Sequence, residues 1–326
     1  MRHEPRAETA APRRGEADRG SERPVALLSF DFEDWNQLVE RDLGLTARTA
    51  SGRAFERQMS VVLDLLDELE AKATFFVLGI SAERYPDLVQ ELAARGHEVG
   101  CHGYAHTRVF RQAPDKFRRD LELGSSLIER LVGVPPRGYR APWFSLNREA
   151  TWAYATLLDL GFEYDSSQYD SPLVPRRLGP IPDVPFRLIL PSGGELAEFP
   201  LSVWRTRRLS VPVGGGSYWR LLPEPILLRA LRAVERSTSY VALYLHPHEL
   251  DPERLCVALP RSSSRRRRLA ALYNRLYADV GRDSLIAKVR RVGREFRFVT
   301  YGGRISTLGE YGPARTRALS EEGDLL

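Results

Sequence analysis

Short apolar runs alternate with amphipathic segments along most of this chain. Residues 25–30 form an apolar run without helical period, which predicts a buried strand. Between residues 59 and 69 the apolar positions recur at the spacing of an amphipathic helix. The same patterns predict further strands at 73–78, 162–165, 198–204, 240–245 and 296–301, a strand end with a loop at 138–143, and further helices at 85–95, 115–131, 147–160 and 225–235.

This alternation of strands and helices favours an α/β fold with a mainly parallel sheet or barrel. Active sites in such folds gather at the carboxyl ends of the strands. Polar motifs follow several of the predicted strands, so we expect them to converge. We assign residues 24–250 to one domain and 251–311 to a C-terminal extension packed on it, with tails at 1–23 and 312–326.

Composition and charge exclude several classes of protein. Hydrophobic residues make up 43% of the 326 positions, which is enough for a sizeable core. The net charge of +5 comes from arginines interleaved with acidic residues, so we expect no nucleic-acid partner. Two cysteines, Cys101 and Cys256, make no disulfide framework, and Cys101 is interpreted as a small buried residue rather than a reactive one. Because no stretch resembles a signal peptide or a membrane span, the sequence predicts a cytoplasmic protein with a disordered N-terminal tail.

Three carboxylates follow the first predicted strand, at Asp31, Glu33 and Asp34. Because alternate residues of a strand share a face, Asp31 and Glu33 point the same way if the extended geometry persists. Asp34 points into the site only if the strand ends there. One such carboxylate can bind a metal ion while another acts as a base. A solvated acidic turn is the alternative interpretation.

Two imidazoles lie four residues apart, at His102 and His106. On a helix or a helical turn both would lie on one face and would chelate one ion. With one carboxylate they would form a facial triad that leaves positions open for water and substrate. Satisfied surface histidines are the alternative for the pair taken alone. His97, just upstream, is interpreted as structural.

Other candidate residues lie at or near the ends of further strands. Arg140 is suited to orient a catalytic carboxylate and Trp143 to form a wall of a sugar pocket, although a surface arginine and a core tryptophan are the alternatives. His246 follows an apolar strand, and an imidazole suits a general acid because its ordinary pKa is near neutrality. Asp165, at another strand end, is a candidate to orient His246.

Taken together, these motifs resemble the polysaccharide deacetylases of the NodB-homology type, carbohydrate esterase family 4. The resemblance covers residues 24–249 and is strongest over 73–79 and 96–106, joined by Arg-Ala-Pro-Trp at 140–143 and Leu-His-Pro at 245–247. The chain as a whole resembles a subgroup with a C-terminal extension that is found among exopolysaccharide-biosynthesis proteins, through residues 29–35, 214–223 and 246–252. This subgroup is also similar to the allantoinase-like branch.

The resemblance implies a distorted, incomplete (β/α) barrel of the NodB type with a C-terminal helical extension. It also implies metal-dependent removal of N-acetyl groups, with O-acetyl groups as a variant, from an amino sugar. The roles that it implies are Asp31 as the base, His102 and His106 as metal ligands, Arg140 as the residue that steadies Asp31, His246 as the acid, and Asp165 as the support of His246.

The acidic motif departs from the usual family pattern of two aspartates in tandem, a base and then a ligand. Here Phe32 separates Asp31 from Glu33 and Asp34. The allantoinase-like branch has an Asp-x-Asp pattern, which favours Glu33 as the third metal ligand and leaves Asp34 as the alternative. We expect a divalent metal, zinc first, with cobalt, nickel and iron as alternatives.

An arginine run from Arg265 to Arg268 opens a predicted helix whose apolar positions, at 269, 272, 273 and 276, share one face. Contact with anionic lipid at the inner face of the membrane, or with a polyprenyl-phosphate carrier, is one interpretation. A packed helix with solvated arginines is the simpler one. In a cytoplasmic protein the substrate would be a lipid-linked or nucleotide-linked amino sugar rather than a finished wall polymer.

Two other functions stay open at this point. A cyclic-amide hydrolase of the allantoinase type would need a pocket for a small flat ring. A catalytically inactive carbohydrate-binding barrel would not need the intact set of candidate residues. The sequence does not indicate which sugar is bound or the oligomeric state.

Overall fold

The computed structural model describes residues 23–45, 52–171, 178–207, 209–257, 259–311, 316–320 and 323–326. Apart from Arg23, the predicted N-terminal tail lies outside this part of the chain. Within these residues, none of the helices combines the length and the apolar character that crossing a bilayer requires.

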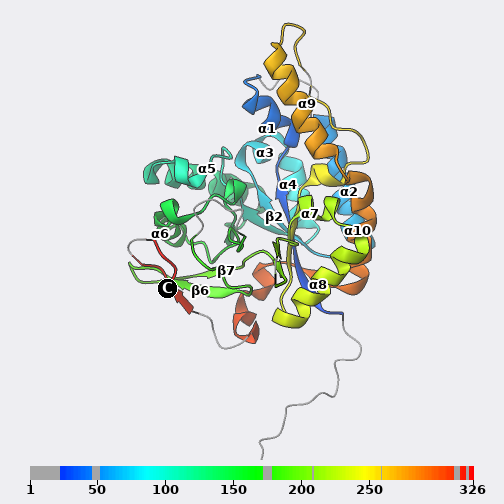
Figure 1. The fold of residues 1–326 in the computed structure, drawn as a ribbon. Coiled ribbons are helices and arrows are strands. Elements are labelled where there is room, and N and C mark those ends of the chain that lie inside the picture. Colours follow the sequence, from blue (N-terminus) through cyan, green and yellow to red (C-terminus); the bar gives the residue numbers. More distant parts are fainter. Residues whose placement is uncertain are drawn as a thin grey trace, which may run out of the picture.

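One large sheet organises the molecule (Figure 1). Its strand order is β10-β1-β2-β3-β4-β5-β7-β6-β12, with β11 also paired to β1, and every pairing is parallel except that of β6 with β7. The strands are β1 (Val25–Phe32), β2 (Thr74–Val77), β3 (Glu98–Cys101), β4 (Gly138–Tyr139), β5 (Tyr164–Asp165), β6 (Phe186–Ile189), β7 (Glu195–Glu198), β10 (Ala242–Leu245), β11 (Arg297–Val299) and β12 (Thr316–Ala318). A separate ribbon pairs β8 (Trp204–Arg205) with β9 (Ser210–Val211).

Helices surround this sheet (Figure 1). The α-helices are α1 (Trp35–Asp42), α2 (Gly52–Glu68), α3 (Gly79–Arg84), α4 (Pro86–Ala94), α5 (Pro114–Val132), α6 (Trp152–Asp159), α7 (Gly216–Leu221), α8 (Glu224–Thr238), α9 (Arg265–Asp279) and α10 (Leu285–Glu295). Short 3-10 segments are η1 (Val109–Arg111), η2 (Pro142–Phe144), η3 (Arg148–Ala150), η4 (Pro247–Leu250), η5 (Arg282–Ser284) and η6 (Gly302–Tyr311).

The sheet curves without closing, because among the described residues its path runs from β10 to β12 and the two end strands do not pair with each other. The predicted α/β class with an incomplete barrel is therefore confirmed. All the parallel strands from β10 to β5 bring their carboxyl ends to one edge, which is where the polar motifs lie.

The central strand β1 is covered on both faces, which fits its mostly apolar sequence. Every residue from Ala26 to Phe32 is buried, and Phe30 stacks on Phe75 of β2 with ring centroids 5.2 Å apart. The apolar face of α2, which includes Met59 and Val62, packs into the same core. This continuous apolar run is the pattern expected for a strand buried on both sides of a parallel sheet.

Two predicted elements differ from the structure. The strand predicted at 198–204 ends at Glu198, because Pro200 has no N–H for a continuous ladder, and β8 begins only at Trp204. The helix predicted at 147–160 is divided into η3 and α6.

The C-terminal part of the chain is more integrated than a packed extension with a tail. Strand β11, inside the assigned extension, pairs with Val25–Leu27 of β1. The predicted tail at 312–326 is wrong for Thr316–Ala318, because β12 pairs in parallel with β6 and buries Leu319 beside it. Both segments satisfy backbone groups of a sheet that would otherwise be exposed.

Candidate active site

The carboxylates of the acidic motif have different roles because β1 ends within the motif. Asp31 lies inside the strand and is only 2% exposed, and the chain turns directly after Phe32, where the backbone N–H of Glu33 donates to the carbonyl of Asp31. Asp34 then caps α1: its Oδ1 accepts from the N–H of Asn36 at 3.0 Å, and its Oδ2 accepts from the hydroxyl of Tyr85 at 2.6 Å. Because these bonds occupy Asp34, Glu33 is the carboxylate left to face the histidines.

His102 follows β3 directly, and its orientation is set by a backbone oxygen. Its Nδ1 lies 2.8 Å from the carbonyl oxygen of Arg140. Because a carbonyl only accepts, Nδ1 must carry the proton, and the lone pair of Nε2 then points towards Glu33 and Asp31. The Nε2 atom lies 3.7 Å from Oε2 of Glu33 and 4.0 Å from Oδ2 of Asp31.

His106 reaches the same place by a loop, and not by the helix or helical turn that would put both imidazoles on one face. The backbone adopts positive φ at Gly103 (+76°) and at His106 (+52°). The carboxylate of Asp120 on α5 holds this loop by accepting from the N–H groups of Tyr104 and Ala105, at 2.8 and 3.0 Å. The local sequence does not show this distant anchor, which is why spacing alone suggested a helix.

Glu33, His102 and His106 form the metal-ligand group that the structure brings together. One donor atom from each lies within 4.8 Å of the others, and all three side chains are buried. Oε2 of Glu33 lies 2.9 Å from Nε2 of His106 but forms no hydrogen bond in the described structure. Burial would raise the pKa of Glu33, yet the imidazoles of His106 and His102 hold it well below its usual range. A buried anion beside two imidazole nitrogens fits a divalent cation.

Arg140 fixes the position of Asp31. The guanidinium is fully buried, and its Nη1 donates to Oδ1 of Asp31 and to Oγ of Ser29, both at 2.8 Å. Its Nε and Nη2 donate to the carbonyl and hydroxyl of Ser166, both at 3.0 Å. The hydroxyl of Tyr301 accepts a further bond at 3.3 Å. This network leaves Oδ2 of Asp31 pointing towards His102 and His246.

His246 follows β10 and faces both carboxylates of the site. Its Nε2 lies 3.4 Å from Oε1 of Glu33 and 3.8 Å from Oδ2 of Asp31. On the other side of the ring, Nδ1 lies 3.2 Å from Oε2 of Glu249, which also accepts from the backbone N–H of His246 at 2.9 Å. Burial lowers the pKa of His246, but the bond to Glu249 and the charges of Glu33 and Asp31 raise it to about 9.

Glu249 therefore takes the place beside His246 that sequence reasoning gave to Asp165, and that prediction is wrong. Glu249 is buried, and the guanidinium Nε of Arg220 lies 3.1 Å from its Oε1. A Cβ atom at Gly216 would overlap this carboxylate, so the glycine that opens α7 makes room for it. The spacing His246-Pro-His-Glu249, with proline first in η4, is a capping signal that could have identified Glu249 from sequence.

Asp165 is engaged elsewhere in the sheet. Its Oδ1 accepts from the hydroxyl of Ser167 at 2.6 Å, and it interacts with the buried carboxyl of Glu198 on β7. Burial raises the pKa of Asp165 to about 6 and that of Glu198 well above its usual value. Strand order explains this, because β5 lies next to β4 and β7 and five strands along from β10.

Trp143 lies at the rim of the site and is 53% exposed. Its ring stacks at a tilt on His106, with centroids 5.4 Å apart, and the guanidinium of Arg108 lies 4.5 Å from its centroid. An exposed indole fixed beside a metal ligand is suited to stack on a sugar ring.

His97 and Cys101 are structural, as the sequence indicated. His97 is 6% exposed, and its Nδ1 accepts from the N–H of Ala73 at 3.4 Å. Cys101 is fully buried at the end of β3, and burial raises the pKa of its thiol to about 12, which keeps it protonated and unreactive.

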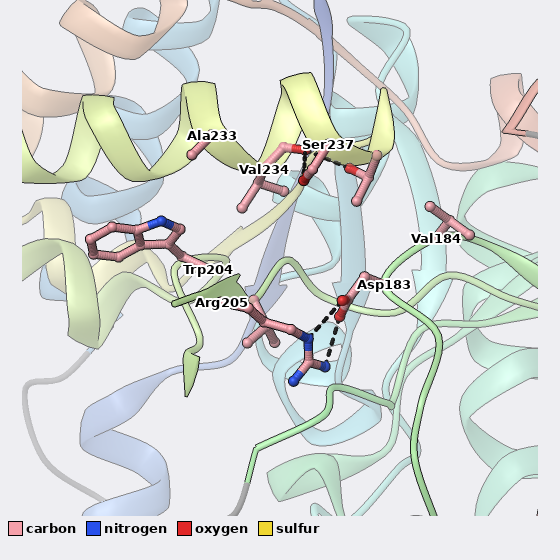
Figure 2. A pocket seen from close by; sticks show the side chains of 9 residues that line it. Asp183, Val184, Trp204, Arg205, Ala233, Val234 and Ser237 are labelled. Carbon is pink, nitrogen blue, oxygen red and sulfur yellow. Dashed lines mark hydrogen bonds and ion pairs between the residues drawn. The ribbon is translucent and has the colours of Figure 1, made fainter. Parts of the chain in front are cut away.

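A cavity lies away from this cluster (Figure 2). It has a volume of about 460 Å³ and is lined by β8, α8 and the segment around Asp183. Its polar groups are already paired: Asp183 accepts from Nε and Nη2 of Arg205 at 2.7 and 2.8 Å, and the hydroxyl of Ser237 donates to a backbone carbonyl at 2.9 Å. None of the candidate catalytic residues lines this cavity, so the chemistry belongs to the cluster at the strand ends.

Comparison with known proteins agrees with this geometry. Residues 44–163 match the family described as polysaccharide deacetylase, and residues 171–303 match a domain of unknown function, DUF3473. The chain therefore contains a polysaccharide deacetylase domain of the NodB type followed by a DUF3473 domain.

Individual relatives cover only part of the sequence or share only the fold. A peptidoglycan-N-acetylglucosamine deacetylase of Bacillus cereus is 34% identical over 93 residues, which are 28% of this chain and 34% of that protein. This chain spans little more than a third of the length of the curated relatives it matches first. A candidate polysaccharide deacetylase of Mycobacterium smegmatis superposes with a TM-score of 0.60 at 21% identity, over 90% of this chain and 94% of that one. The PuuE allantoinase superposes with a TM-score of 0.58 at 14% identity, over 89% and 92%. Both structures show the same fold, which confirms the predicted NodB-type architecture.

Proposed function

We propose that this protein is a metal-dependent hydrolase that removes N-acetyl groups from an amino sugar of a polysaccharide or of its biosynthetic intermediate. The observation that carries the proposal is the convergence of three groups at one edge of the sheet: the Asp31–Arg140 pair, the cluster of Glu33, His102 and His106, and His246. The matching deacetylase domain and the activity named for the Bacillus cereus relative support the same reaction.

Glu33, His102 and His106 would hold a divalent metal, for which we propose zinc because the donors are two imidazoles and one carboxylate. Such a metal polarises the amide carbonyl and lowers the pKa of a bound water. The hydrogen bond that Nδ1–H of His102 donates to the carbonyl of Arg140 keeps that imidazole in the tautomer that binds a metal through Nε2.

Asp31 acts as the base in this proposal. Arg140 engages its Oδ1, so Oδ2 remains to take a proton from the attacking water. Buried guanidinium and carboxylate groups hold their geometry without solvent competition, which keeps the base aimed at the site.

His246 acts as the acid. Its Nε2 faces the site while its Nδ1 is held by Glu249, so the ring can deliver a proton from Nε2 to the departing amine. The Glu249 carboxylate stabilises the imidazolium that precedes this transfer. Glu249 is therefore a positioning residue rather than a catalytic one.

We further propose that the substrate is a lipid-linked or nucleotide-linked amino sugar of exopolysaccharide biosynthesis, handled in the cytoplasm. The exposed indole of Trp143 supports a sugar ring as the bound group, in preference to the small flat ring of an allantoinase-type substrate. The two free cysteines, one of them exposed at Cys256, are consistent with a reducing compartment.

Metal content and acetate release test the proposal together. The purified protein should contain a divalent metal and release acetate from N-acetylglucosamine oligomers, and chelation should abolish the release until zinc is returned. Asp31→Asn should lower turnover by at least about 100-fold, whereas the matched exposed substitution Asp283→Asn should not change it. Full activity after metal removal would overturn the mechanism, and turnover of allantoin without acetate release would favour the cyclic-amide alternative.

A further inference from the structure

Helix α9 carries a row of large apolar side chains that the rest of the described chain leaves uncovered. Six positions in or just after this helix are between 42% and 69% exposed. They are Leu269, Leu272, Tyr273, Leu276, Tyr277 and Val280. At 100° per residue these positions fall within an arc of about 140°. The simpler interpretation from sequence, a helix that packs this face against the protein, is therefore wrong.

The packing of α9 is the reverse of that of an ordinary surface helix. Its buried positions are the small residues Ala271 and Ala278, which lie on the side of the helix opposite the apolar row. The neighbouring helix α10 shows the usual arrangement, with Leu285, Val289 and Val292 buried. Because a large exposed apolar row is costly in water, its presence marks a binding surface.

The charge of α9 indicates which kind of partner surface the helix can bind. The helix contains five arginines, four of them in its first turn, and its one acidic residue is the last, Asp279, which pairs with Arg282. Among the described residues, no ion pair is formed by the run from Arg265 to Arg268. Cations in the first turn oppose the helix dipole, so they do not stabilise the helix itself. They are complementary to an extended anionic partner.

The helix is placed on the side of the molecule where the strands end. In Figure 1, α9 projects beside α1, the helix that directly follows β1. The amide Nδ2 of Asn36 in α1 donates to the carbonyl of Cys256, in the segment that leads to α9, at 2.6 Å. The ring of Trp35 lies 6.0 Å from that of His248, two residues after His246. A surface that engages α9 is therefore close to the candidate active site.

We propose that α9 docks on an anionic lipid bilayer, with its apolar row in the headgroup region and its arginines on lipid phosphates. Tyrosines and leucines on one face with arginines at the helix end are the composition of interfacial helices. The long arginine stems allow the guanidinium groups to reach phosphates while the row inserts. Docking would present the strand edge to a lipid-linked sugar; this last consequence, unlike the docking, rests on the proposed function.

Vesicle co-sedimentation of the full chain tests this. The protein should bind vesicles of phosphatidylcholine mixed with phosphatidylglycerol, should not bind phosphatidylcholine alone, and should lose binding at high salt. Removing two arginines, as Arg265→Gln with Arg266→Gln, should weaken binding by at least about tenfold. Replacing part of the apolar row, as Leu272→Ser with Leu276→Ser, should weaken it by a similar factor. These side chains are exposed, so the variants should keep the melting temperature of the parent protein.

Matched controls lie on α5, where Leu123 is 57% exposed and Arg130 is also exposed. Leu123→Ser with Arg130→Gln should bind vesicles like the parent protein. Acetate release from soluble oligomers should be unchanged in the α9 variants, which separates a failure of docking from a failure of the proposed function. Vesicle binding that is absent, or that the α9 substitutions leave intact, would overturn the proposal. So would a dimer in solution that Leu272→Ser with Leu276→Ser dissociates, since a second copy would then cover the face.

Discussion

The buried pair of Arg140 and Asp31 should be the most sensitive point of the molecule to loss of a single charge. Both side chains are at most 3% exposed. Arg140→Gln would leave the Asp31 carboxylate buried without its cation. The hydroxyls of Ser166 and Tyr301 would also lose the hydrogen bonds that the guanidinium donates to them. Of the ion-pair partners that the described residues provide, Asp31 would retain the imidazoles of His246 and His102, at 3.8 and 4.0 Å.

The expected loss of unfolding free energy follows from leaving the Asp31 charge buried without a partner. Removing one member of a buried ion pair costs about 3–5 kcal/mol of unfolding free energy, because the remaining charge keeps its desolvation penalty without the compensating attraction. For a domain of this size, about 1 kcal/mol shifts the melting temperature by about 2–4 °C. We therefore expect Arg140→Gln to lower the melting temperature of the metal-free protein by roughly 10 °C.

A double-mutant cycle is the assay that isolates the pair. The parent protein, Arg140→Gln, Asp31→Asn and the double variant would be unfolded in urea with chelator present, since bound metal would add its own stabilisation. The double variant buries no unpaired charge from this pair, so it should be about 2 kcal/mol more stable than the sum of the single effects predicts. Circular dichroism at each urea concentration gives the four unfolding free energies.

An exposed pair provides the control. Arg118 and Asp159 lie 2.7 Å apart, but their side chains are 38% and 62% exposed. Arg118→Gln should cost no more than about 1 kcal/mol, because solvent screens such pairs. A loss below about 1 kcal/mol for Arg140→Gln, or strictly additive effects in the cycle, would refute the reasoning.

Three further predictions concern individual residues. His106→Gln should weaken zinc binding by more than about 100-fold in calorimetric titration, because it removes a ligand rather than an outer partner; unchanged affinity would exclude this loop from the site. Glu249→Gln should lower kcat by about 10–100-fold with little change in KM, since the residue positions His246 without touching substrate; an effect on KM alone would argue for a binding role. Burial lowers the pKa of His97 from 6.5 to about 4. As the pH falls, His97 is therefore protonated in the unfolded chain before it is protonated in the folded protein, and this lowers the free energy of unfolding between about pH 6.5 and pH 4. Between pH 7 and pH 5 the parent protein should therefore lose about 2 kcal/mol more than His97→Phe does in urea unfolding, and equal losses would contradict the assignment.

Most of the fold could be predicted because hydrophobic period is a local property. The runs at 25–30 and 73–78 are apolar on both faces, and they became neighbouring parallel strands. The helix at 115–131 has one apolar face, and it became α5 almost to the residue. The failures occur where a local pattern met a competing constraint, as at Pro200, which interrupts the strand predicted at 198–204.

The candidate site was predictable in its members but not in all their partners. The site residues are identifiable because Asp31 lies in the last positions of β1 and the others follow strand ends, and these ends meet at one edge of a parallel sheet. These others are His102, His106, Arg140 and His246. The choice between Glu33 and Asp34 as metal ligand required the tertiary structure. It depends on the hydrogen bonds that Asp34 accepts at the start of α1 and from the hydroxyl of Tyr85.

The sequence by itself determined the class of fold, the set of chemical groups and the edge at which they gather, since these depend on residue type and on periods of two to four positions. Only the tertiary structure decided that Asp165 lies away from His246, that Asp120 bends the loop to His106, and that α9 turns its large apolar side chains outward. Each of these outcomes depends on which distant segments pack together. That packing follows from strand order and register over the whole sheet, which no local pattern contains.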